Sequence, residues 1–168
     1  SEFESGDRLI VIQTTGDLLH VPADVWKIST KTVQRAHDAF LEMGSVDDHA
    51  ITKFFKLFAD YLSNEERFSA IKDSNDEDVR VAKSRGRPTT RLVLSEKMRE
   101  DMVAGLRLWE NTPSQRGSAI EEISHDGWKV KLITAGLGVI GFIFEGRPNV
   151  FADATGVLRS GNTVVFRI

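Results

Sequence analysis

The stretch of sequence that decides the fold is GVIGFIFEGRPNVFADATGVLRSGNTVVFR, residues 138–167. The apolar run over 137–144 is typical of a strand that is buried on both faces. Downstream we expect a short helix within 150–159, a turn at 160–162 and a second strand over 163–167. Two parallel strands connected by a helix form a βαβ unit, a building block of α/β proteins. The sequence therefore predicts the start of an open, mostly parallel sheet.

Upstream of this unit, a short β-rich start is followed by a long helical segment. Residues 8–21 hold two β-rich runs around the turn signal at 15–17, which predicts a hairpin or an edge element. Ser29-Thr30 and Ser95 are capping residues at the starts of helical apolar patterns. Polar and apolar residues alternate over 128–134, which predicts a strand. Helices are predicted over 29–43, 47–62, 65–72, 76–84 and 95–109.

These patterns divide the chain into four segments. Residues 1–6 read like a cloning remnant, 7–28 form an N-terminal extension, 29–112 are helical, and 113–168 are expected to hold the first strands of a nucleotide-binding sheet. The predicted fold class is α/β, with N-terminal helices packed on the start of that sheet. A doubly wound dinucleotide fold needs more strands than these. We therefore expect the chain to be a truncated part of a larger protein.

Composition narrows the classes of function. The 22 basic and 25 acidic residues give a net charge of −3 and are interspersed, so nucleic acid is not an expected partner. The longest apolar stretch is shorter than the roughly 20 residues of a membrane span, which favours a cytoplasmic protein without membrane contact. The sequence has no cysteine, and its four histidines lack ligand spacing. Disulfides, thiolate chemistry and a metal site are therefore not expected within these residues.

The turn after the first predicted strand carries a resemblance. Residues 145–149 read EGRPN, residues 160–162 read SGN, and Arg167 follows at the end of the next strand. This pattern resembles the γ-glutamyl phosphate reductase (glutamate 5-semialdehyde dehydrogenase) branch of the aldehyde dehydrogenase superfamily. General aldehyde dehydrogenases have Pro-Trp-Asn at the turn and a lysine at the position of Arg167. The sequence departs from the branch at Gly136 and Gly146, where proline and alanine are usual.

The resemblance implies an NADP-dependent reductase that converts an acyl phosphate, with γ-glutamyl phosphate as the expected substrate, to the semialdehyde in proline biosynthesis. Such enzymes use a cysteine thiolate and a hydride from NADPH. Asn149 is the expected catalytic oxyanion donor. Arg147 and Glu145 are expected to bind substrate, and Arg167 is expected to bind the cofactor at its adenosine ribose or 2′-phosphate. Each also has a structural alternative: Asn149 and Glu145 could order the turn, Arg147 could be a surface or structural arginine, and Arg167 could be a fray-prone terminal residue.

Because the sequence has no cysteine, the isolated chain is expected to be inactive. The expected partners are the small-molecule substrate, the remainder of the same polypeptide and further copies in a homo-oligomer. The alternative function is a non-catalytic interaction or regulatory module that keeps a reductase-like scaffold. The choice between NADPH and NADH, the acyl group and the role of residues 7–28 stay open at this point.

Overall fold

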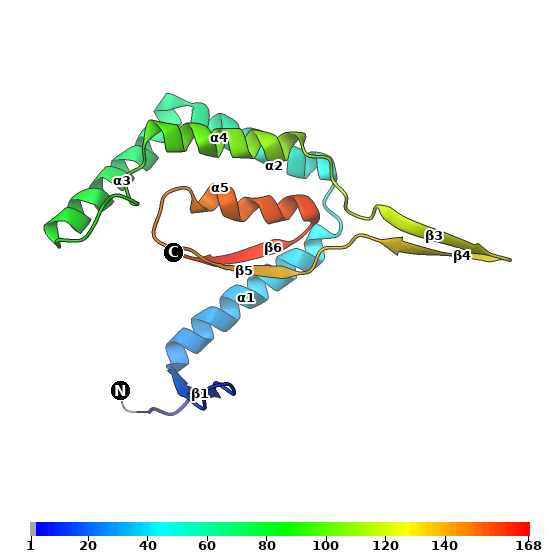
Figure 1. The fold of residues 1–168 in the computed structure, drawn as a ribbon, viewed down its shortest axis with the longest axis horizontal. Helices are drawn as coiled ribbons and strands as arrows, with labels where there is room; N and C mark the ends of the chain where they lie inside the picture. Colours follow the sequence, from blue (N-terminus) through cyan, green and yellow to red (C-terminus); the bar gives the residue numbers. More distant parts are fainter. Residues whose placement is uncertain (1–2) are drawn as a thin grey trace.

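The computed structural model describes residues 3–168, which fold into helices, three small sheets and connecting loops (Figure 1). The long helices and the short fifth one are α1 (Ala23–Met43), α2 (Asp48–Ser63), α3 (Glu65–Ser84), α4 (Glu96–Asn111) and α5 (Val150–Thr155). Helix α5 continues directly as the 3-10 helix η1 (Gly156–Ser160). No helix within these described residues is both long enough and apolar enough to cross a bilayer.

Each of the three sheets has two strands. The strands are β1 (Arg8–Val11), β2 (Leu18–Val21), β3 (Ala119–His125), β4 (Trp128–Ile133), β5 (Val139–Ile143) and β6 (Thr163–Arg167). The first two pairs are antiparallel hairpins, whereas β5 and β6 are parallel and in register from Val139–Thr163 to Ile143–Arg167. The predicted βαβ unit and the α/β class are therefore confirmed.

Helix α5 lies between the β5–β6 pair and the helices α2 and α4, while α1 crosses the other face of the pair (Figure 1). The hydroxyl of Thr163 on β6 donates to the Ala36 carbonyl of α1 at 2.7 Å. The core lies where α2, α4 and α5 meet, and Phe55 and Leu106 are its fully buried centre. Helix α2 contributes four buried side chains to this core, spaced so that they lie on one face of the helix: Ile51, Phe55, Ala59 and Leu62.

The helix starts follow capping rules in two cases and differ in a third. The side chain of Ser95 caps α4, as expected, and that of Asp47 caps α2. Helix α1, in contrast, begins at Ala23 rather than at Ser29. Its first turn is held from outside, because the Asp7 carboxylate accepts a hydrogen bond from the Ala23 amide at 2.8 Å. A local sequence pattern cannot predict a capping residue that is distant in the sequence.

Helix α3 is one continuous helix, so the prediction of two helices over 65–72 and 76–84 is wrong. The polar stretch between them includes Asn75, a residue that often competes with helical backbone bonds. Here its side chain bonds elsewhere: it donates to the Leu92 carbonyl at 2.8 Å and accepts from the Leu94 amide at 2.9 Å. The helix continues because this amide is satisfied by the loop before α4.

The strands also correct two expectations. Strand β3 was not predicted, because the consecutive Glu121 and Glu122 break the alternation. Strand β5 was expected to be buried on both faces, yet its last residue, Ile143, is 88% exposed. The cause is that β5 pairs only with β6 in the described part of the chain. Gly136 is required by packing, since a Cβ there would lie 2.5 Å from the Gly161 carbonyl oxygen.

Candidate functional site

The segment between β5 and α5 lies at the carboxyl ends of both parallel strands. The Phe144 amide, which follows β5, donates to the carbonyl of Arg167 at the end of β6, at 2.9 Å. Because both strands run in the same direction, the turn at 145–149 and Arg167 share one edge of the sheet. This edge is where open α/β sheets bind their ligands. The structure thus brings all four predicted site residues to one end of the β5–β6 pair.

Asn149 precedes the first turn of α5 but does not cap it with its side chain. Its Nδ2 donates to Oδ2 of Asp153, one turn later, at a long 3.4 Å. Its Oδ1 is buried and has no hydrogen-bond partner anywhere in residues 3–168. Buried amide oxygens are normally paired, so this atom is an exception that asks for an explanation. The side chain lines a groove of about 540 Å³ between α4 and α5.

Arg147 points its guanidinium to the same carboxylate. Its Nη2 lies 3.3 Å from Oδ2 of Asp153, and its guanidinium carbon lies 5.9 Å from the centre of the Phe144 ring. The side chain is 42% exposed. Arg147 lines a second, more apolar groove of about 610 Å³ beside Phe151 and Ile71. The two predicted site residues therefore face different grooves, and Met102 of α4 lines both.

Glu145 and Arg167 lie on the exposed rim of this edge. Glu145 forms an ion pair with Arg91, which comes from the loop between α3 and α4. Both side chains are about two-thirds exposed or more, so the pair is a weak anchor. Arg167 is exposed, and its guanidinium forms no ion pair or hydrogen bond with the part of the chain described here. It is free to meet a ligand at the end of β6.

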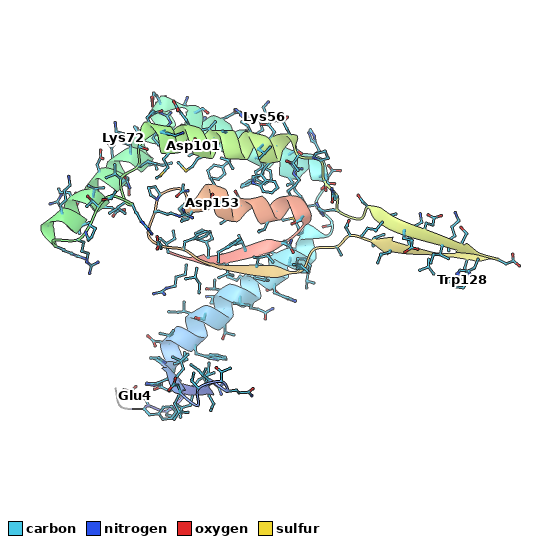
Figure 2. The ribbon with its side chains drawn as sticks, in the orientation of Figure 1. Glu4, Lys56, Lys72, Asp101, Trp128 and Asp153 are labelled. Atoms are coloured by element: carbon cyan, nitrogen blue, oxygen red, sulfur yellow. The ribbon has the colours of Figure 1, made fainter. Side chains whose placement is uncertain are left out.

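Sequence reasoning missed Asp153, the carboxylate that contacts both Asn149 and Arg147. The signal that could have found it is its spacing, four residues after Asn149 in a predicted helix, because residues at that spacing are neighbours. Figure 2 shows Asp153 on α5, in the layer between the sheet and helix α4, which carries Asp101. Both aspartates line the first groove.

A second missed residue holds α5–η1 in place. Arg159 of η1 is only 5% exposed and donates from Nε and Nη2 to the Trp109 carbonyl, at 3.1 and 2.8 Å. Its Nη1 donates to the Thr52 hydroxyl at 3.0 Å, and its guanidinium lies over the Phe55 ring at 5.2 Å. Burial lowers the pKa of Arg159. This side chain joins the helix that follows Asn149 to the ends of α2 and α4.

Known proteins supply an independent comparison. The gamma-glutamyl phosphate reductase of Chlorobium chlorochromatii is 30% identical over 140 residues, which are 80% of this chain and 33% of that protein. The enzyme of the same name from Moorella thermoacetica is 38% identical over 108 residues, 61% of this chain and 26% of that protein. The chain is similar to gamma-glutamyl phosphate reductases. It spans about a quarter to a third of the length of these curated relatives, and no family model matches it.

Solved structures agree with the sequence relatives. The crystal structure of gamma-glutamyl phosphate reductase from Thermotoga maritima matches with a TM-score of 0.72 and 27% identity, over 82% of this chain and 34% of that one. The same enzyme from Saccharomyces cerevisiae matches with a TM-score of 0.67 over 83% of this chain, and its 23% identity supports the fold alone. The resemblance expected from residues 145–167 and the α/β fold are both confirmed.

Proposed function

We propose that the protein carrying this chain is an NADP-dependent reductase that converts an acyl phosphate, γ-glutamyl phosphate, to the semialdehyde. The supporting observation is the position of the EGRPN turn, residues 145–149. It lies at the carboxyl edge of a parallel strand pair in a chain similar to gamma-glutamyl phosphate reductases. At this edge the Asn149 amide and the Arg147 guanidinium lie in one turn, and the Arg167 guanidinium lies at the end of β6.

Asn149 is proposed as the oxyanion donor. Acyl transfer places negative charge on the former carbonyl oxygen, and one preorganised donor is worth about 2.7 to 4 kcal/mol in the transition state. The Asn149 amide group carries two hydrogens, of which Asp153 accepts one. The other remains available on the groove side.

Arg147 and Glu145 are proposed on the substrate side. A guanidinium presents a planar set of donors that matches a carboxylate or a phosphate, and γ-glutamyl phosphate carries both groups. Arg147 is half-exposed, and its guanidinium contacts Asp153 at 3.3 Å and lies 5.9 Å from the centre of the Phe144 ring. Its remaining donors can meet a substrate anion while Nη2 stays on Asp153. Glu145 orders the same turn through Arg91.

Arg167 is proposed to hold the cofactor. The donors at the end of β6 suit a phosphate or a ribose hydroxyl, because the Arg167 guanidinium is exposed and has no competing carboxylate among residues 3–168. NADPH, when bound, supplies the hydride for the reduction. Arg167 contributes to this by fixing the adenosine end of the cofactor at the sheet edge.

A thiolate nucleophile cannot come from these 168 residues, which contain no cysteine. Under this proposal the nucleophile belongs to the remainder of the polypeptide, and the isolated chain is inactive. Homo-oligomer formation and a cytoplasmic location belong to the same proposal. These two points rest on the likeness to gamma-glutamyl phosphate reductases.

The test is an assay of the natural gene product that contains this chain. NADP reduction is followed with glutamate semialdehyde and phosphate as substrates, and Asn149→Ala should lower kcat about a hundredfold. A matched control is Asp38→Ala, which removes the acceptor of an amide–carboxylate contact to Gln34 on exposed α1. Absence of activity with every aldehyde tested would contradict the proposal and favour the non-catalytic module.

A further inference from the structure

Two donors of the proposed site converge on a single oxygen atom. Nη2 of Arg147 and Nδ2 of Asn149 lie 3.3 and 3.4 Å from Oδ2 of Asp153. No other side chain in residues 3–168 makes a hydrogen bond or ion pair with this carboxylate. Asp153 is 46% exposed, so a purely structural ion pair here would stabilise the fold only slightly. The convergence calls for another explanation.

The carboxylate determines which end of the Asn149 amide faces it. A carboxylate only accepts hydrogen bonds, so it pairs with the NH2 group and repels the amide oxygen. Rotating the amide by half a turn would place Oδ1 of Asn149 against Oδ2 of Asp153, two acceptors in contact. The present orientation leaves Oδ1 buried without a partner, a cost that the contact to Asp153 offsets.

This orientation leaves the second amide hydrogen of Asn149 available to a ligand in the groove that the side chain lines. With one amide hydrogen on Asp153, the planar geometry of the group fixes the direction of the second one. Both Asn149 and Asp153 line the groove between α4 and α5. A carboxylate this close to an oxyanion would oppose its charge, but the Arg147 guanidinium on the same oxygen neutralises it. The three groups thus form one unit.

We propose that Asp153 is a positioning residue for the reduction: it orients the Asn149 amide toward the oxyanion and keeps Arg147 beside the same site. This inference rests on the proposed function. It predicts that Asp153 acts through Asn149 and has no effect of its own on the chemical step. A residue that acts only through another loses its effect when that other residue is removed.

The kinetic test is a double-mutant cycle in the natural gene product. Asp153→Ala should lower kcat by about ten- to a hundredfold in the wild-type background and have no further effect on kcat in the Asn149→Ala background. Asp153→Asn should restore most of kcat, because its amide oxygen still accepts from Asn149 and Arg147. An equal loss from Asp153→Ala in both backgrounds, or an unchanged kcat, would overturn the inference.

A readout besides activity is the side-chain amide signal of Asn149 by NMR in the 168-residue chain. Asp153→Ala, which removes the acceptor, should shift this signal and leave that of Asn75, which bonds to the Leu92 carbonyl, unchanged. An unshifted Asn149 signal would show that the contact is absent and overturn the inference. If Asn149→Ala lowers kcat a hundredfold and Asp153→Ala leaves kcat unchanged, the positioning role of Asp153 is overturned and the proposed function stands. An inactive wild type would overturn the proposed function and the positioning role together.

Discussion

At the scale of single residues, arginines that look alike in the sequence have different roles in the structure. Arg99 and Arg159 are each 5% exposed, and their guanidinium groups bond to main-chain carbonyls at helix ends. Arg147 and Arg167 are exposed at the sheet edge. A buried guanidinium that satisfies carbonyls is part of the fold, whereas an exposed one is available to a ligand. Burial therefore separates structural arginines from candidate binding residues.

Replacing Arg159 tests the structural role. Arg159→Met keeps an unbranched side chain over Phe55 but leaves the Trp109 carbonyl and the Thr52 hydroxyl without their donor. We expect the free energy of unfolding to fall by about 2 to 3 kcal/mol, measured by urea denaturation. Arg87→Met is the control, since the exposed Arg87 side chain has no hydrogen bond or ion pair within residues 3–168. Equal stability of both variants would contradict the role.

At the scale of elements, the N-terminal hairpin is attached to α1 through one carboxylate. Asp7 accepts from the Ala23 amide at 2.8 Å and from the Glu4 amide at 2.9 Å, and it lies 2.6 Å from Nε2 of His20. These hydrogen bonds, that from Glu4 first and that with His20 next, lower the pKa of Asp7 against the opposing effect of burial. The hairpin β1–β2 thereby caps the helix that follows it.

Low pH should weaken the attachment of the N-terminal hairpin to α1 through Asp7. Because the pKa of folded Asp7 is below that of the unfolded chain, its stabilisation is complete above about pH 4 and is lost as the pH falls through the folded pKa. Amide hydrogen exchange of the first turn of α1 should therefore accelerate in acid, after correction for intrinsic rates. Asp7→Asn should abolish this pH dependence, and Asp24→Asn should keep it. An identical acid response in Asp7→Asn would count against the cap.

At the scale of the whole molecule, apolar surface is distributed unevenly. Leu137, which lies just before β5, and Ile143, the last residue of β5, are 89% and 88% exposed. The β3–β4 hairpin extends away from the body (Figure 1), and apolar side chains on it, Trp128 among them, are also exposed. Large apolar side chains exposed to this extent are candidates for an interface. In the relatives, of which the matched residues make up only 26% to 33%, more chain is available to cover it.

The isolated 168-residue chain should therefore self-associate. The unpaired strand edges of the β5–β6 pair offer backbone groups to a second copy, and the neighbouring apolar side chains add to the attraction. Light scattering should show dimers or larger species, and Ile143→Gln should reduce them. Leu41→Gln, which changes an exposed residue of α1, should not. A strictly monomeric wild-type chain would refute this expectation.

The sequence alone determined the local elements and the resemblance. Apolar periodicity and capping residues located α2, α4 and the βαβ unit, because these signals act between residues close in the chain. The EGRPN turn carried the resemblance to the reductase family. Both sources of information are local. The predicted roles of Asn149, Arg147, Glu145 and Arg167 and the four-segment division stay predictions.

Only the tertiary structure decided where α1 begins, that α3 is continuous, and which carboxylate contacts both Asn149 and Arg147. Asp7 and Ala23 are 16 residues apart, and Asn75 reaches a loop 17 and 19 residues away. Such contacts form only after the chain has folded back, so no local pattern encodes them. Asp153 was near Asn149 in sequence, but its role depends on Arg147 meeting the same oxygen. That convergence is a property of the folded turn.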